Sequence, residues 1–190
     1  MPPDRLHDAP AARLARDLLG RVLASELGGE RVSGLIVETE AYLGLDDPAS
    51  HAWRGARRRG QEGIWNPSGH WYVYRSHGLH WCLNLTCGPE AHGAAVLIRA
   101  LEPLEGIAVM RTRRGAGRPD RILANGPGKL AQALAITGAV DGMRATATAA
   151  VRLERMGETR DARRTEVTPR IGISRAADWP LRFLLLPSGQ

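Results

Sequence analysis

The stretch Gly34 to Gly44 begins with apolar residues, and three polar side chains that could do chemistry follow near its end. They are Glu38, Glu40 and Tyr42, each two residues from the next. Because alternate residues of a β-strand share a face, a strand here places both carboxylates and the phenol side by side. Carboxylates this close repel one another, and such a pair can supply a general base beside an aromatic wall. The alternative is an edge strand with solvated acids.

Flat side chains and arginines gather in a second region of the chain. Five of the nine aromatic residues fall between positions 65 and 81, with His70, His77 and His80 among them. Four arginines occupy the glycine-rich stretch 54–63 just before, which we expect to be a surface loop. Strand aromatics usually pack in a core, but a ring at a hairpin tip, where we place His77, is not explained that way. Proteins use rings and arginines together to stack on an unstacked base and hold its phosphates.

The charge of the chain points to an anionic partner. The 190 residues carry a formal charge of +6, and the sequence pI is about 10.3. Every basic residue except Lys129 is an arginine, whose planar guanidinium suits phosphate oxygens and can stack on bases. A nucleic acid fits this balance. A generally basic solvated surface, or a codon bias toward arginine, is the alternative.

The cysteines and apolar segments indicate where the protein works. Cys82 and Cys87 are too few for a disulfide framework. Charged residues interrupt the leucines near the N-terminus, and no stretch approaches the ~20 apolar residues that a membrane span needs. We therefore expect a cytoplasmic, nucleoid-associated monomer with no membrane partner.

Metal and phosphate-loop motifs are incomplete. Two histidines and two cysteines between positions 77 and 87 fit no common zinc spacing, so packed or stacking histidines are the better interpretation. Asp46-Asp47 is more typical of a helix cap than of a metal-dependent nuclease. Gly126-Pro-Gly-Lys129 lacks the spacing of a phosphate loop, although a helix start can bind phosphate weakly. We expect neither a metal nor a cofactor.

The hydrophobic pattern predicts a sheet with helices around it. Strands dominate the first half and their connections are short, which favours an antiparallel sheet over a parallel one. We expect one α+β domain over residues 1–190, with a curved, mainly antiparallel, open barrel-like or roll-like sheet flanked by helices and a protruding β-hairpin. The expected helices are 10–20, a short one with His51 and Trp53, 106–114 and 125–136; the expected strands are 22–27, 31–39, 70–75, 80–86, 94–101, 151–154, 171–173 and 181–186, with a polar loop at 155–164.

Six blocks of sequence along the chain can be compared as a set. They are Ile-Val-Glu-Thr-Glu-Ala-Tyr-Leu-Gly (36–44), Ser-His (50–51), Tyr-Val-Tyr (72–74), Leu-Ile-Arg-Ala-Leu-Glu-Pro-Leu-Glu-Gly (97–106), Gly-Pro-Gly-Lys-Leu (126–130) and Pro-Leu-Arg-Phe (180–183). Together they resemble the alkyladenine-type 3-methyladenine DNA glycosylases, in the family's order and over roughly Leu14 to Phe183. The first and fourth blocks are long and specific. The resemblance implies an enzyme that flips a damaged purine out of duplex DNA and hydrolyses its N-glycosidic bond.

The resemblance also implies roles for individual residues. Glu40 would be the general base that activates a water aimed at the anomeric carbon. Arg99 and a backbone carbonyl near Ile171 would position that water, whereas Glu38 matches the motif without a catalytic role. The pocket for the base would be lined by Tyr42, His51 and Tyr74, and Asn84 would exclude the 2-amino group of guanine.

The chemistry of the leaving base sets the expected substrates. An N-alkylated purine such as 3-methyladenine or 7-methylguanine is cationic, so it departs as a neutral base and one carboxylate with one water suffices. Neutral bases such as hypoxanthine or ethenoadenine need protonation, so their excision stays open, as does a preference for single or double strands. A lyase step needs an amine, and Lys129 is placed at a helix start. We therefore expect a monofunctional enzyme that leaves an abasic site.

The sequence departs from the family at the hairpin tip. The family inserts a residue there that is usually tyrosine, and this chain has His77. We hypothesise that His77 still acts as the wedge, more weakly, with Arg75 and Trp81 able to compensate and Lys129 near the phosphates. The altered wedge is the only sequence support for the first alternative, a non-catalytic module that binds damaged DNA. A metal-dependent nuclease is the second alternative.

Overall fold

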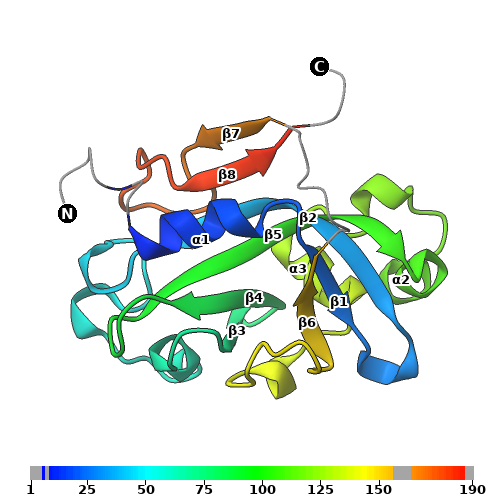
Figure 1. Ribbon diagram of the computed structural model, residues 1–190, viewed down its shortest axis with the longest axis horizontal. Helices are drawn as coiled ribbons and strands as arrows, with labels where there is room; N and C mark the ends of the chain where they lie inside the picture. The colour runs from blue at the N-terminus through cyan, green and yellow to red at the C-terminus, as the bar shows by residue number, and fades with distance from the viewer. Residues whose placement is uncertain (1–5, 7–8, 156–163, 187–190) are drawn as a thin grey trace.

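The computed structural model describes residues 6, 9–155 and 164–186 (Figure 1). Within that part of the chain no helix has the length and apolarity needed to cross a bilayer. The α-helices there are α1 (Pro10–Leu18), α2 (Ile107–Arg114) and α3 (Pro127–Ala133); the strands are β1 (Val22–Ser25), β2 (Val32–Tyr42), β3 (Trp71–Ser76), β4 (His80–Cys87), β5 (Ala94–Glu105), β6 (Val151–Glu154), β7 (Thr165–Thr168) and β8 (Arg182–Leu185).

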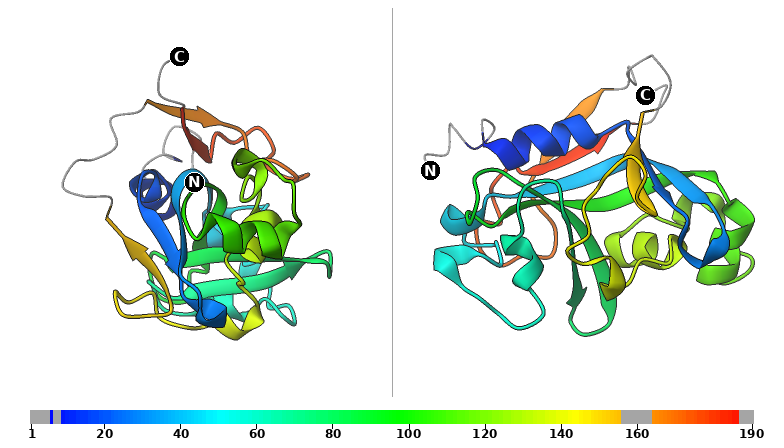
Figure 2. Two further views of the ribbon diagram at one scale, coloured as in Figure 1. Left: turned by 90° about the vertical axis from the view of Figure 1, so that its right-hand side faces the viewer. Right: turned by 60° about the horizontal axis from the view of Figure 1, so that its bottom comes forward.

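All of these strands belong to one antiparallel sheet. Its order is β3-β4-β5-β2-β1-β6, with β8 beside β2 and β7 beside β8. The long strand β2 organises the sheet, because β5 pairs along one of its edges while β1 and then β8 pair along the other. The sheet curves without closing into a barrel (Figure 2). The predicted α+β class with an open, antiparallel sheet is confirmed.

The two faces of β2 have different neighbours. Helix α1 packs against β2 and β5 (Figure 1), and its small side chains Ala11, Ala12 and Ala15 are buried. The Thr39 hydroxyl donates a hydrogen bond of 2.8 Å to the Ala15 carbonyl, so the helix covers the face that carries Thr39. Because successive side chains alternate, Glu38, Glu40 and Tyr42 lie on the other face.

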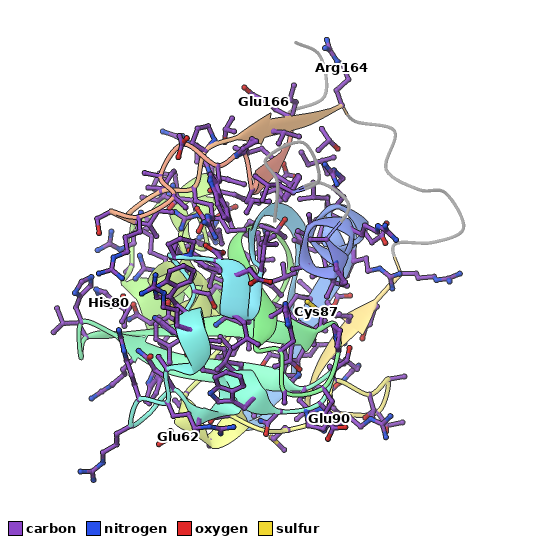
Figure 3. The ribbon with its side chains drawn as sticks, turned by 90° about the vertical axis from the view of Figure 1, so that its left-hand side faces the viewer. Glu62, His80, Cys87, Glu90, Arg164 and Glu166 are labelled. Carbon is purple, nitrogen blue, oxygen red and sulfur yellow. The ribbon has the colours of Figure 1, made fainter. Side chains whose placement is uncertain are left out.

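The hairpin of β3 and β4 leaves the sheet at its outer end, as predicted. Only Asn84 to Cys87 of β4 pair with β5, so the outer part extends past the sheet edge, where Figure 3 shows His80. At the turn, His77 and Gly78 have φ values of 50° and 69°, and the Leu79 amide donates to the Ser76 carbonyl at 3.0 Å. Two successive residues with positive φ are typical of the type I′ turns that suit twisted hairpins.

Several predicted elements differ from the observed ones. The strand predicted at 171–173 is wrong: the segment is a bend, and β8 pairs instead with β7, which the sequence pattern did not predict. Strand β5 continues to Glu105, beyond its predicted end, because its later residues keep pairing with β2. His51 lies in a turn before the short 3₁₀ helix Trp53–Gly55, and helix α3 is shorter than predicted. Residues 156–163 of the predicted polar loop lie outside the described residues.

Candidate active site

A row of four side chains crosses the sheet on the face opposite α1. The register pairs Tyr72 with Asn84, Asn84 with Leu97, and Leu97 with Glu40. Directly paired residues in antiparallel strands point to the same face, so these four are neighbours although they come from four separate strands. The row continues to Arg182 of β8, which pairs with Glu40.

A β-bulge in β5 aims Arg99 at both carboxylates of β2. The register pairs Thr39 with Ile98 and Glu38 with Ala100, which leaves Arg99 as the extra residue. The Nε of Arg99 donates to Glu38 at 2.8 Å, and its Nη1 lies 3.3 Å from Glu40 Oε2. The two carboxylates therefore share one guanidinium, which offsets the repulsion expected between them.

Glu38 orients the guanidinium of Arg99. Its Oε1 accepts hydrogen bonds from Arg99 and, at 2.6 Å, from Arg182 Nε. Charge-assisted bonds of this length restrict the guanidinium to few orientations. Glu38 thus orients Arg99, and its expected lack of a catalytic role stays a prediction. Sequence reasoning missed Arg182, whose only signal was its place in the Pro-Leu-Arg-Phe block.

Glu40 is fully buried and hydrogen-bonded through both oxygens. Its Oε1 accepts from the Ile171 amide at 2.8 Å, and its Oε2 accepts from the Tyr42 hydroxyl at 2.9 Å. Burial, and next the charge of Glu40, raises the pKa of Tyr42, so the phenol keeps its proton and donates. Such a carboxylate can take a proton from a water molecule once the phenol moves aside. The Ile171 contact is made by the amide, and the predicted role of a nearby carbonyl stays a prediction.

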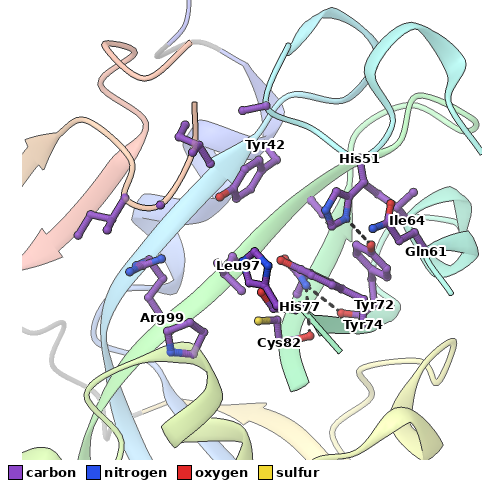
Figure 4. A pocket seen from close by; sticks show the side chains of 18 of the residues that line it. Tyr42, His51, Gln61, Ile64, Tyr72, Tyr74, His77, Cys82, Leu97 and Arg99 are labelled. Carbon is purple, nitrogen blue, oxygen red and sulfur yellow. Dashed lines mark hydrogen bonds between the residues drawn. The ribbon is translucent and has the colours of Figure 1, made fainter. Parts of the chain in front are cut away.

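A cavity of about 720 Å³ with aromatic walls is lined by the three neighbours of Glu40, namely Tyr42, Arg99 and Ile171, and not by Glu40 itself. Figure 4 shows Tyr42 on one side and His51, Tyr72 and Tyr74 on the other. The rings of His51 and Tyr74 meet edge to face at 4.6 Å, and those of Tyr72 and Tyr74 stack at 5.4 Å. The structure therefore brings together the pocket residues Tyr42, His51 and Tyr74, and the volume is in the usual range for a small-molecule site.

The aromatic rings of the far wall carry no charge at neutral pH, although the Arg58 guanidinium also lines the cavity. His51 Nδ1 lies 2.7 Å from the Tyr72 hydroxyl. Burial, and to a lesser degree the charge of Arg58, lowers the pKa of His51 to about 4. Burial is also the main cause that raises the pKa values of Tyr72 and Tyr74. Sequence reasoning did not assign Tyr72 to the site, although its Tyr-Val-Tyr block was recognised.

Asn84 lies on the cavity wall with its amide group held in place. Its Nδ2 donates to the Tyr72 carbonyl at 3.1 Å, and Leu97 and Cys82 line the cavity beside it. The side chain is only 3% exposed, so it has little freedom to make room for a bulkier base. The predicted clash of Asn84 with the 2-amino group of guanine stays a prediction, and 7-methylguanine, which carries the same amino group, would meet it as well.

Of the three residues predicted to touch DNA, His77 lines the cavity, whereas Arg75 and Lys129 do not. His77 is exposed and contributes to the cavity mouth, and the Arg75 guanidinium lies over the Trp81 ring at 5.0 Å. Lys129 is exposed on α3, where it donates to the Asn125 side chain at 2.9 Å. The hairpin tip also carries Leu79, which is 72% exposed and was missed from the sequence. Their contacts with DNA stay predictions.

The segment after Tyr42 is tied to the segment that carries Ile171. Asp47 and Arg170 form a fully buried ion pair, and Asp47 Oδ1 also accepts from the Ala49 amide at 3.0 Å. The short-range bond stabilises a turn, and no helix begins there, so the helix cap predicted at Asp46-Asp47 is wrong. The pairing with Arg170 joins residues too far apart in the chain for local patterns to reveal.

The histidines and cysteines of the hairpin do not converge. Cys82 and Cys87 are buried free thiols, while His80 is exposed at the other end of β4. Across the described ranges, no three residues among His, Cys, Asp and Glu are grouped so that they could hold a metal ion.

Comparison with known proteins identifies the family. The family model described as methylpurine-DNA glycosylase matches residues 5–188. A protein of Agrobacterium fabrum named putative 3-methyladenine DNA glycosylase is 47% identical over 171 residues, which cover 90% of this chain and 83% of that protein. Proteins with the same name from Nitrosospira multiformis (47% identity; 95% and 88% of the two chains) and Methanoculleus marisnigri (43%; 96% and 94%) are similar over almost their whole length. The chain belongs to the methylpurine-DNA glycosylase family and is a DNA-repair hydrolase of N-glycosyl bonds.

Proposed function

We propose that the protein flips N-alkylated purines, in particular 3-methyladenine and 7-methylguanine, out of duplex DNA and hydrolyses their N-glycosidic bonds. The observation that carries this proposal is the buried carboxylate of Glu40, bonded to Tyr42 and near Arg99, beside a cavity walled by aromatic rings. The extruded base would enter between Tyr42 and the rings of His51 and Tyr74, where stacking contributes ~1–3 kcal/mol per base.

In this proposal Glu40 activates the attacking water. Entry of the base would take the Tyr42 phenol away from Oε2 and leave that oxygen free to accept a proton from water. Arg99 stays near the same oxygen because Glu38 holds its Nε, so it can orient the water. A positioned general base contributes roughly 10²–10⁴ in rate, which is the size of effect assigned to Glu40.

The rings around the cavity offer no acid, which favours bases that depart without being protonated. The His51 imidazole is neutral above its lowered pKa of about 4, and the phenols hold their protons tightly because their pKa values are raised. None of these groups is a ready acid for a departing base, and a cationic purine needs none. We therefore infer slower excision of hypoxanthine and ethenoadenine, which are neutral.

The absence of a suitable amine supports a monofunctional reaction. Lys129, the only lysine of the chain, is exposed on α3, bonded to Asn125 and not part of the cavity wall. The product would then be an intact abasic site. Borohydride trapping of a covalent complex between protein and DNA would contradict this part of the proposal.

The test compares wild type and Glu40→Gln for release of free base from duplexes that carry 3-methyladenine, 7-methylguanine, hypoxanthine or ethenoadenine. We expect wild type to release the two cationic bases, and Glu40→Gln to be at least ~100-fold slower while its affinity for the duplexes is retained. No release of any base by wild type would refute the proposal. Equal rates for the two proteins would refute the role of Glu40. Action as a cytoplasmic monomer on double-stranded DNA is part of the same proposal.

A further inference from the structure

The ion pair of Asp47 and Arg170 is buried behind the cavity wall. Both side chains have no exposed surface, and the Arg170 Nη2 donates to Asp47 Oδ1 at 2.9 Å. The Nη1 of Arg170 donates to the other oxygen of Asp47 and, at 2.9 Å, to the Ala41 carbonyl. The guanidinium is therefore fixed in one plane by a carboxylate and by the backbone next to Tyr42.

That plane lies against the ring of Tyr42. The Cζ of Arg170 is 4.7 Å from the ring centroid. Tyr42 forms part of the cavity wall, whereas Arg170 is buried and does not, so the guanidinium covers the face of the ring turned away from the cavity. The residue after Arg170 is Ile171, whose amide bonds to Glu40. One cation thus touches the stacking ring and adjoins the segment that holds the carboxylate.

Stability alone is a weak reason for this arrangement. A buried ion pair often stabilises a fold no better than apolar residues of the same volume. Here the Nε of Arg170 is also buried and has no hydrogen-bond partner among the described residues. Buried donors are nearly always paired, so an unpaired one calls for another explanation. The remaining contact of this guanidinium is with the ring of Tyr42.

We propose that Arg170 is a positioning residue for the Tyr42 ring and that Asp47 neutralises it, so that a cationic purine can stack on the opposite face. This inference rests on the proposed function. A stacked base lies ~3.5 Å from the ring, so its charge would be roughly 8 Å from the guanidinium. Without Asp47, two like charges at that distance and an effective dielectric constant of about 20 would weaken binding of the cationic base by at least about tenfold.

The experiment measures Kd for two duplexes, one with 2′-fluoro-7-methylguanosine (cationic) and one with 2′-fluoroinosine (neutral). The fluorine disfavours the positively charged sugar of the transition state, so both substrates persist during the measurement. For each variant the ratio of the two Kd values is compared with the wild-type ratio. Because both values come from one preparation, the ratio does not depend on the fraction of folded protein.

The two single substitutions have opposite expected effects. Asp47→Asn should raise the Kd of the cationic duplex about tenfold relative to the Kd of the neutral duplex. Arg170→Gln should lower the same ratio by a similar factor. The double variant Asp47→Asn/Arg170→Met should restore the wild-type ratio while both duplexes bind more weakly, because the ring has lost its support. Asp46→Asn, the same change at the exposed neighbour, is the matched control and should leave the ratio unchanged.

Shifts in the same direction, or no shift in either single variant, would overturn the role of Asp47. If one single variant does not fold, the other still decides the sign. Wild-type affinity of the double variant for both duplexes would overturn the positioning role of Arg170. If wild type neither prefers these duplexes to undamaged DNA nor releases 7-methylguanine from an unfluorinated duplex, the proposed function fails instead.

Discussion

Replacing His51 by glutamine should remove a defined part of the acid sensitivity of the fold. Burial, followed by the charge of Arg58, lowers the pKa of His51 from 6.5 to about 4. As the pH falls below 6.5, the unfolded chain takes up a proton on this imidazole and the folded chain does not. The stabilising contribution is therefore fully present above pH 6.5 and is lost progressively as the pH falls from 6.5 through 4.

The size of this loss follows from the two pKa values. One unit of pKa difference corresponds to about 1.36 kcal/mol, so the complete effect of the shift is about 3 kcal/mol. Between pH 7.5 and 4.5 most of it is realised, and the free energy of unfolding should fall by about 2 to 3 kcal/mol because of His51 alone. Glutamine has no titration here and can still bond to the Tyr72 hydroxyl, which limits the disturbance to packing.

The measurement is urea denaturation of wild type, His51→Gln and His77→Gln at pH 7.5 and 4.5. All proteins share the remaining titrating groups, so only the difference between them is informative. We expect the unfolding free energy of wild type to fall by about 2 to 3 kcal/mol more than that of His51→Gln. His77→Gln removes a histidine from the exposed hairpin tip and serves as the control for loss of an imidazole.

Equal losses in wild type and His51→Gln would refute the reasoning, because they would mean that the folded protein protonates His51 as readily as the unfolded chain does. The same protonation bears on activity. An imidazolium in the cavity wall would repel a cationic purine, so release of 7-methylguanine by wild type should decline as the pH approaches 4, beyond the decline caused by unfolding.

Three further predictions concern the site and the hairpin. Glu38→Gln should slow single-turnover excision about tenfold, with little change in affinity for the lesion, because the bond from Arg99 Nε loses its charged acceptor; unchanged excision would show that Arg99 needs no charged partner. When lesion DNA is titrated with each protein, Tyr42→Phe should keep the wild-type affinity, whereas Tyr42→Ala should lose ~1–3 kcal/mol of binding free energy. Equal affinities of wild type and both variants would exclude stacking on this ring. Both His77→Ala and Leu79→Ala should weaken binding and excision if the exposed tip enters the base stack, and a variant without effect would remove that residue from the wedge.

The sequence was sufficient for the parts of the site that lie on regular strands. Alternation along β2 placed Glu38, Glu40 and Tyr42 on one face. The aromatic residues between positions 71 and 81 lie on the β-hairpin, as predicted. These inferences succeed because a strand fixes the direction of each side chain once its register is known. The family resemblance added which residues matter, and the structure brings Glu40, Arg99, Tyr42 and Ile171 together.

The remainder depends on contacts between distant parts of the chain. The bulge that aims Arg99 exists only in the pairing of β5 with β2, and no local pattern announces it. The partner of Asp47, Arg170, comes directly before the segment 171–173, which was predicted as a strand and is a bend. Short apolar runs such as 171–173 resemble buried strands in composition, and only tertiary contacts decide between a strand and a cavity wall.

The row of paired residues from Tyr72 to Glu40 also fixes the distance between the aromatic wall of the cavity and the carboxylate. Neighbouring strands lie ~4.8 Å apart, so its two ends are separated by three strand spacings, or roughly 14 Å. Such a length cannot be adjusted gradually, because only the insertion or loss of a whole strand changes it. Side-chain replacements along the row can therefore alter which base is admitted. The distance from Tyr72 to the carboxylate of Glu40 does not change with them, because the backbone hydrogen bonds of the sheet set it.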